Sequence, residues 1–316
     1  MTDGCGRIIN YLRLSITERC TLRCAYCRAG EGDCRKKHEL SAELLVRITR
    51  IMAELGITKV RVTGGEPMLR RDLLKIIEGI RAIDSIHEIN MTTNAQHLTG
   101  RVASLKVAGL DRLNISIDSL KEGRYADMTG GGCLQTALLG IDEALQAGFV
   151  PLKLNAVLIR GINDDEMADF IELTRDRPID MRFIELMPFG SVEQNDRRVS
   201  GDEIRGAFPM LVPVNKRYDS QPANDYQIPG YIGRVGLIDA MSHRFCNNCN
   251  RIRVMSDGML RPCLGQNAEV SLLQMLKQGD DAALAARIRE AIYHKPAHHG
   301  FGEEFVSDKN MSRIGG

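Results

Sequence analysis

Short apolar runs alternate with stretches that carry apolar residues at helical spacing over the first two thirds of the chain. The runs are rich in β-branched residues and short enough to be strands. In the first helical stretch Leu44, Ile48, Ile51 and Leu55 recur every three or four residues, between a capping Ser41 and a terminating Gly56. The predicted strands cover residues 11–17, 59–63, 88–92, 112–117, 150–159 and 181–186, and further helices follow at 71–83, 134–147 and 164–174.

Repeated alternation of strands and helices predicts an α/β fold with a parallel sheet and right-handed crossovers. Six units are too few to close an eight-stranded barrel, so residues 1–190 are expected to form a partial (βα)6 TIM-type barrel. Functional groups of such a sheet lie at the carboxyl ends of its strands. Residues 191–316 contain a segment rich in Pro, Gly and polar residues and then a helical stretch near 270–293; they predict a smaller C-terminal region packed onto the barrel.

Charge and composition restrict the class of partner. The 316 residues include 42 Lys and Arg against 41 Asp and Glu, a formal net charge of +1, so no global bias favours nucleic acid or an anionic membrane. The longest stretch without a charge, residues 128–141, is too short and too rich in glycine to span a bilayer. No apolar leader precedes Arg7, Arg13 and Glu18. We therefore expect a cytoplasmic protein that contacts neither membrane nor nucleic acid.

Two cysteine triplets are the strongest chemical signal. In a chain without an export signal, clustered cysteines indicate metal or cluster ligands rather than disulfides. Cys20, Cys24 and Cys27 follow the first strand, and three thiolates can hold three irons of a 4Fe-4S cluster while the fourth iron stays open. A zinc site that recruits His38 as fourth ligand is the alternative.

The second triplet, Cys246, Cys249 and Cys263, also has no adjacent fourth cysteine and predicts a second cluster of the same kind. A zinc knuckle that recruits His243 is the alternative from spacing. Arg251 and Arg253 follow the second cysteine directly, where guanidinium groups would meet an anionic ligand of that cluster. The cysteines outside the triplets, Cys5, Cys34 and Cys133, are expected to be free thiols, and the basic run at residues 35–37 has no assigned role.

The first triplet, with the aromatic Tyr26 before its last cysteine, resembles the signature of the radical S-adenosylmethionine (SAM) superfamily. The order of the later motifs agrees: Gly64-Gly65-Glu66-Pro67 ends the second strand, Ser116 and Asp118 end the fourth, and Met187 follows the sixth. The resemblance implies that SAM binds the open iron and that Glu66 receives its amino group. The SAM contacts implied in this way are Tyr26, Gly65, Glu66, Ser116 and Met187.

Over essentially its full length the chain further resembles the GTP 3',8-cyclase family of molybdenum cofactor biosynthesis. The segments that carry this likeness are RFIELMP at 182–188, CNNCNRIR at 246–253, DGMLRPCL at 257–264 and the terminal Gly315-Gly316. The resemblance implies a lyase with two 4Fe-4S clusters, in which the glycine tail takes part in catalysis at the active site. The residues implied to contact GTP are Arg13, Arg61, Thr92, Lys153, Arg251 and Arg253.

The implied reaction is a radical cyclisation. A 5'-deoxyadenosyl radical from SAM removes the 3' hydrogen of GTP, and the new carbon radical adds to C8 to give, after reduction, 3',8-cyclo-7,8-dihydro-GTP. The same likeness implies an external one-electron reductant, a downstream cyclic pyranopterin monophosphate synthase and a homodimer. Two other classes stay open at this point: another two-cluster radical SAM enzyme such as a peptide maturase, and a zinc-stabilised binding module. The paired Arg251 and Arg253 with the glycine tail favour the nucleotide reaction.

Overall fold

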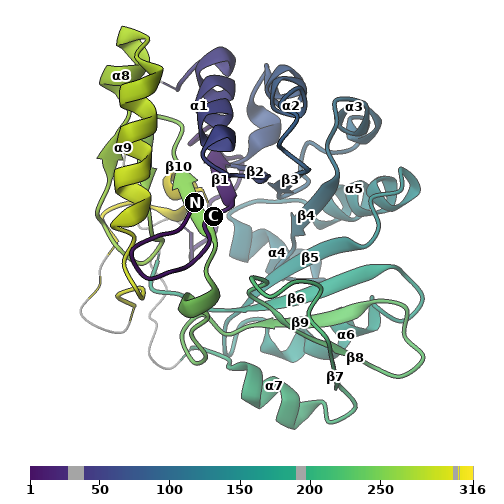
Figure 1. Cartoon of the computed structure of the whole chain (residues 1–316). Coiled ribbons are helices and arrows are strands. Elements are labelled where there is room, and N and C mark those ends of the chain that lie inside the picture. Colours follow the sequence, from purple (N-terminus) through teal and green to yellow (C-terminus); the bar gives the residue numbers. More distant parts are fainter. Residues whose placement is uncertain (28–38, 190–196, 302–304, 306, 316) are drawn as a thin grey trace.

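A computed structural model describes residues 1–27, 39–189, 197–301, 305 and 307–315 of the chain. Within these residues one twelve-stranded sheet has the order β12-β11-β10-β1-β2-β3-β4-β5-β6-β9-β8-β7, with helices along its outer side (Figure 1). The six predicted strands are confirmed and pair in chain order, all in parallel. They are β1 (Tyr11–Ser15), β2 (Lys59–Thr63), β3 (Glu88–Thr93), β4 (Arg112–Ser116), β5 (Leu152–Leu158) and β6 (Ile179–Glu185).

The C-terminal residues extend this sheet at both ends. β10 (Arg251–Val254) pairs in parallel with β1, and β9 (Arg234–Ile238) pairs in parallel with β6. Antiparallel strands complete the edges: β11 (Met259–Arg261) and β12 (Val270–Ser271) beyond β10, and β8 (Asn224–Gln227) and β7 (Val212–Val214) beyond β9. Residues after 197 thus share the sheet of the barrel, and the division at residue 190 stays a prediction.

The expected helices form between the parallel strands. α1 (Ala42–Glu54) begins at Ser41, whose side chain accepts a hydrogen bond from the Leu44 amide at 3.4 Å. α2 (Leu73–Arg81), α5 (Leu134–Gln146) and α6 (Met167–Glu172) fall within the predicted stretches, and α3 (Val102–Val107), α4 (Glu122–Thr129), α7 (Gly201–Ala207) and α10 (Met311–Ile314) add to them.

The predicted helical stretch at 270–293 is divided. Its start is strand β12, and α8 (Leu273–Gln278) ends at Gly279 with a φ of +75°. α9 (Asp281–Tyr293) then begins anew, because the Asp280 side chain accepts a hydrogen bond from the Ala283 amide at 2.8 Å and caps it. Across the described residues no helix is long and apolar enough to cross a membrane.

Alternation along the strands divides the core from the site. Successive side chains of a strand point to opposite faces. On β1 and β2, Leu12, Leu14, Val60 and Val62 are fully buried in the main hydrophobic core, which also takes in the helices. Polar side chains occupy the intervening positions and face the inner side of the sheet. That inner face carries the candidate site.

Candidate active site

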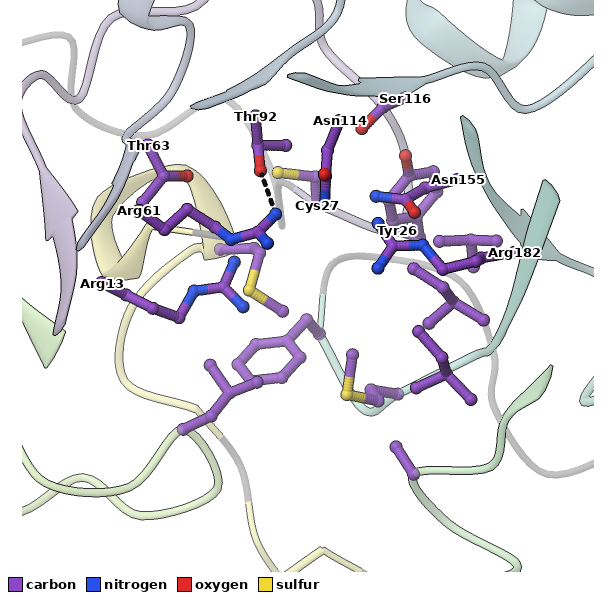
Figure 2. Close-up of a pocket in the computed structure, with 18 of the residues that line it drawn as sticks. Arg13, Tyr26, Cys27, Arg61, Thr63, Thr92, Asn114, Ser116, Asn155 and Arg182 are labelled. Atoms are coloured by element: carbon purple, nitrogen blue, oxygen red, sulfur yellow. Dashed lines mark hydrogen bonds between the residues drawn. The ribbon is translucent and has the colours of Figure 1, made fainter. Parts of the chain in front are cut away.

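A cavity of about 300 Å³ lies on the inner side of the parallel sheet (Figure 2). Its wall combines strand residues with the first cysteine loop and the C-terminal tail. Of the residues predicted to bind a cofactor or substrate, most line it: Arg13, Cys20, Cys24, Tyr26, Cys27, Arg61, Gly65, Thr92, Ser116, Met187, Arg251 and Arg253. The described wall does not include Glu66, Lys153, Cys246, Cys249, Cys263 or Gly315, while Gly316 lies outside the described residues.

Three arginines form a row across neighbouring strands. Arg13 of β1 is in register with Arg253 of β10 on one side and with Arg61 of β2 on the other. Burial, together with the charges of Arg253 and Arg61, holds the pKa of Arg13 well below its ordinary value. Burial, with the charge of Arg251, also lowers the pKa of Arg253 to about 10, so this guanidinium stays charged near neutral pH. Crowded buried cations of this kind require an anionic partner.

The cavity also presents hydrogen-bonding atoms that no described residue satisfies. Arg182 Nε, Arg251 Nε and the Asn155 Oδ1 are buried and have no hydrogen-bond partner within the described residues. Buried polar groups normally find partners, so these atoms indicate room for a polar ligand. A polyphosphate with a purine base supplies both acceptors and donors. The wall therefore fits an anionic nucleotide.

Arg182, Asn114 and Asn155 were missed by the sequence analysis. All three line the cavity, and the Asn114 amide oxygen accepts hydrogen bonds from Arg61 and Arg182. Arg61 also donates from Nη1 to Thr92 Oγ1 at 3.1 Å, the dashed contact in Figure 2. The signal that could have found them is the alternation of β4, β5 and β6, which turns every second residue inward.

Lys153 lies on β5 between these groups and outside the cavity wall. It is 7% exposed and in register with Asn114 and Asp180. Burial, with the charges of Arg182 and Arg61, lowers the pKa of the Lys153 ammonium to about 7. Its charge state is therefore sensitive to an anion nearby.

The first cysteine triplet faces the same cavity from the loop after β1. Burial raises the pKa of Cys24 well above its ordinary value, and the neighbouring Asp118, Cys27 and Cys20 raise it further. All three cysteines of this triplet line the cavity. Their loop is also fixed at the tail, since the Met311 amide donates to the Cys27 carbonyl at 3.0 Å.

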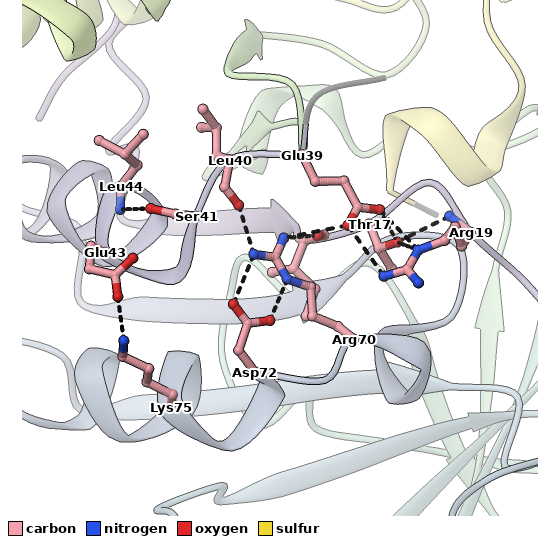
Figure 3. A network of polar contacts seen from close by, with 11 residues as sticks. Thr17, Arg19, Glu39, Leu40, Ser41, Glu43, Leu44, Arg70, Asp72 and Lys75 are labelled. Carbon is pink, nitrogen blue, oxygen red and sulfur yellow. Dashed lines mark hydrogen bonds and ion pairs between the residues drawn. The ribbon is translucent and has the colours of Figure 1, made fainter. Parts of the chain in front are cut away.

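Arg70 fixes the two ends of the segment that contains this loop (Figure 3). Its guanidinium donates to the Ile16 carbonyl at 2.5 Å and to the Leu40 carbonyl at 2.7 Å, and it pairs with Asp72 at 2.7 Å. Arg70 is 5% exposed, so these contacts are shielded from water. Beside it, Glu39 accepts hydrogen bonds from Thr17 and Arg19 at 2.5 and 3.3 Å, which adds a second tie across the segment.

The glycine-rich turn after β2 brings backbone against backbone. A Cβ at Gly65 would lie 2.2 Å from the Arg19 carbonyl oxygen, so only glycine fits here. Glu66 is fully buried beneath the wall, where it accepts hydrogen bonds from Thr93 Oγ1 and the Asn94 amide, each at 2.7 Å, and from the Met68 amide at 3.0 Å. Its contact with the amino group of SAM stays a prediction.

On the opposite side, Tyr26 and Asp118 form one hydrogen-bonded unit. The Tyr26 hydroxyl donates to Asp118 Oδ2 at 2.7 Å and the Val157 amide donates to Asp118 Oδ1 at 2.9 Å. Burial outweighs these donors and raises the pKa of Asp118 to about 6. Ser116 and Met187 lie on the same wall, and the whole side suits a polar adenosine portion next to an apolar patch.

Buried cations hold the second cysteine triplet. Arg7 donates to the Cys246 carbonyl at 3.0 Å, and Lys295 donates to the Pro262 carbonyl at 2.6 Å. Burial raises the pKa of the Cys249 thiol, but the charges of Arg251 and Lys295 outweigh it and the pKa falls below its ordinary value. The flanking Phe245, Arg251, Arg253 and Leu264 reach the cavity wall.

The donor chemistry of both triplets fits iron–sulfur clusters. Each triplet offers three thiols, enough to hold three irons of a 4Fe-4S cluster, whereas a closed structural zinc site needs a fourth ligand. His243, the proposed fourth zinc ligand, instead contacts Asp202 at 3.1 Å. Cys5 and Cys133 are exposed, and His38, Cys34 and residues 35–37 lie outside the described residues.

The C-terminal tail reaches the site, since Met311 and Ser312 line the cavity. Arg253 donates to the Gly315 carbonyl, and Arg313 pairs with Glu18 at 3.3 Å. Gly315 has a φ of +81°, and a Cβ there would lie 2.9 Å from Thr63 Cγ2. The preceding Ile314 is buried against Phe189 and Phe301.

Two family models match the chain. The Radical SAM superfamily model matches residues 14–174, and the Molybdenum Cofactor Synthesis C model matches residues 179–301. A GTP 3',8-cyclase of Alkaliphilus oremlandii (strain OhILAs) is 46% identical over 322 aligned residues that cover 100% of both chains. The chain belongs to the GTP 3',8-cyclase family. A second member, from Alkaliphilus metalliredigens (strain QYMF), is 45% identical with 100% of both chains covered.

Solved structures agree on the fold of this family member. The crystal structure of Streptococcus suis SuiB bound to S-adenosylmethionine has a TM-score of 0.61 and 17% identity, covering 89% of this chain and 68% of SuiB. At that identity the likeness shows the fold alone. The predicted radical SAM architecture is confirmed, and the zinc-stabilised binding module is wrong.

Proposed function

We propose that this protein is a GTP 3',8-cyclase of molybdenum cofactor biosynthesis, with the cavity of Figure 2 as its active site. The family assignment states the reaction, and one structural observation carries its assignment to this cavity. The arginine row and the thiols of Cys20, Cys24 and Cys27 face the same enclosed space. SAM on a cluster next to a nucleoside triphosphate accounts for both features, the cluster thiols and the concentration of buried positive charge.

On one side of the cavity, Cys20, Cys24 and Cys27 would hold a 4Fe-4S cluster with one open iron. When bound there, SAM and the reduced cluster supply the organic radical that takes the 3' hydrogen of GTP. Gly65 lets the backbone approach the ligand closely, and Tyr26, Ser116 and Met187 would border its adenosine portion. Glu66 would act from beneath the wall through the amide and hydroxyl groups it orients.

On the other side, GTP would bind with its triphosphate toward the arginine row. Arg13, Arg61 and Arg253 supply three charges in one register line, and Arg251 and Lys153 add two more nearby. Thr92 holds the Arg61 guanidinium in place. The triphosphate carries about four negative charges near neutral pH, which the row compensates without water.

The second triplet, Cys246, Cys249 and Cys263, would hold another 4Fe-4S cluster that binds the guanine. Bound in this way, GTP would have its ribose between the two triplets, where C3' could lose its hydrogen and bond to C8. Orientation of this kind contributes several kcal/mol to a unimolecular step. The tail residues Gly315 and Gly316 would close the site beside Arg253, which already contacts the Gly315 carbonyl.

The proposed reaction also requires partners outside this site: a reductant and an enzyme that uses the product. Cleavage of SAM would consume one electron, and reduction of the cyclised radical to the 7,8-dihydro product would consume a second with a proton, so an external one-electron reductant would have to supply two electrons per turnover. The product, 3',8-cyclo-7,8-dihydro-GTP, would pass to a cyclic pyranopterin monophosphate synthase. We also propose that the protein forms a homodimer, as the resemblance of its sequence implies.

A substrate comparison tests the proposal. We expect anaerobically reconstituted protein to release 5'-deoxyadenosine several-fold faster with GTP than with ATP, and to convert only GTP to a cyclised product. Arg251→Ala should lower GTP use by about tenfold or more and leave SAM binding unchanged, as expected for loss of one charged contact. Equal losses for both ligands, or equal stimulation by ATP, would reject the assignment.

A further inference from the structure

Arg261 is a fully buried cation that the reaction above does not use. It ends β11, two residues before Cys263, and is 0% exposed. Its guanidinium donates to the Cys263 carbonyl at 3.3 Å and to the Leu264 carbonyl at 3.4 Å. It also donates to the side-chain oxygen of Asn267 at 3.0 Å. One side chain thus holds the loop that follows the last cysteine.

The same guanidinium reaches the C-terminal tail. Arg261 Nη1 lies 3.2 Å from Asp308 Oδ1 and 3.1 Å from Glu269 Oε1. Glu269, 9% exposed in its side chain, also pairs with Lys309 of the tail. Asn267 Oδ1 accepts a further hydrogen bond from the Asp308 amide at 3.3 Å. Two cations and two carboxylates therefore join the cysteine loop to the tail and compensate one another.

The tail beyond this junction leads straight into the site. α10 follows Asn310, and its Met311 amide donates a hydrogen bond to the Cys27 carbonyl. Gly315 comes next, and its carbonyl accepts a hydrogen bond from Arg253. The charged junction lies only a few residues before these contacts in the sequence. Fixing the start of so short a segment restricts where its end can lie, because little chain remains to lose order.

We propose that Arg261 and Glu269 are positioning residues that latch the C-terminal tail to the loop of the second cysteine triplet. In this arrangement the tail reaches the cavity only when that loop is in place, so tail docking depends on a folded second cluster site. The inference rests on the proposed role of the tail in the active site. The latch itself is a structural statement and can be tested without turnover.

Tail opening can be measured by trypsin on the reconstituted holoenzyme, because Lys309 and Arg313 are cleavable only when the tail leaves its place. Arg261→Gln and Glu269→Gln alter the loop side alone and leave the tail sequence unchanged. We expect loss of residues 310–316, followed by intact mass, to be about tenfold faster in each variant, the change for one lost charge-assisted hydrogen bond.

Arg81→Gln serves as the matched control, since Arg81 also joins a carbonyl and a carboxylate, Gly109 and Asp111, away from the tail. Its tail should be cleaved at the wild-type rate. Wild-type cleavage in Glu269→Gln, or equal acceleration in Arg81→Gln, would overturn the latch. If instead the clipped wild-type protein still cyclises GTP, the tail's catalytic role fails while the latch stands.

Discussion

Single buried residues set how this site responds to pH. Lys153 has a pKa of about 7 because it is buried among arginines, so the free protein loses this charge as the pH rises above 7. A bound triphosphate favours the charged form and raises that pKa, and binding then takes up a proton. We predict that the Kd for GTP rises by up to about tenfold per unit between pH 7 and 8.5.

Lys153→Met is the variant that isolates this effect. It should bind GTP more weakly at pH 7 and show a nearly flat Kd over the same pH range, measured by calorimetry on the reconstituted protein without SAM, which cannot turn over. Arg182 and Arg253 each have a pKa of about 10, so these two guanidinium groups do not titrate in this window. A wild-type Kd that is independent of pH would show that Lys153 does not sense the nucleotide.

Among single residues, the sequence identified some of those that line the cavity and missed others. Cysteine spacing and the glycine-rich turn identify Cys20 or Gly65 by motif alone. Arg182 and Asn155 belong to no spacing pattern, and their role depends on which strand face turns inward, which the sheet register decides. Glu66 shows the opposite case: the motif predicted a ligand contact, and the fold buries its carboxylate under three hydrogen bonds.

Among the elements, the connection from β1 to α1 depends on one side chain. Replacement of Arg70 by Gln should remove donors from the buried Ile16 and Leu40 carbonyls and lower stability by about 3 kcal/mol. Thermal unfolding of the reconstituted protein measures the loss, and SAM affinity should fall with it because the first cysteine loop loses its anchor.

Lys75→Gln on the neighbouring α2 is the control for that change. Lys75 pairs with Glu43 at the surface (Figure 3), where both side chains are more than 60% exposed and ion pairs contribute little. We expect no measurable shift in unfolding temperature. If Arg70→Gln behaves like Lys75→Gln, the anchor is unimportant.

The helices and strands predicted from the sequence are confirmed where neighbouring residues alone carry the pattern. The six parallel strands and α1 follow from alternation and capping. β10, inside the second cysteine motif, was missed because it is a strand through pairing with the distant β1. β7 was missed because its three residues, VPV, are too few to show a pattern and include a proline. Gly279 and Asp280 divided the last helical stretch, which its apolar spacing alone did not reveal.

Over the whole molecule, the sheet brings both chain regions around one cavity, and Met311 and Ser312 of the tail line it. Gly315→Ala should displace the tail, since its Cβ would clash with Thr63 and its φ of +81° disfavours alanine. We expect GTP cyclisation to fall by about tenfold or more, in line with a clash or strain of a few kcal/mol. Iron content should stay unchanged.

Gly6→Ala is a matched control for backbone strain. Gly6 has the same φ of +81°, but a Cβ there meets nothing within 4 Å. Its cyclisation rate should remain close to wild type. Similar losses in both variants would attribute the effect to general strain rather than to the tail's place in the site.

The central claim is that one cavity brings GTP and a SAM-derived radical together. The most direct measurement supplies GTP deuterated at C3' to protein reconstituted to about eight irons per chain, as two 4Fe-4S clusters require. The account predicts one deuterium in the released 5'-deoxyadenosine and a product with C3' bonded to C8. Release of 5'-deoxyadenosine without deuterium, at a rate that GTP does not change, would contradict it.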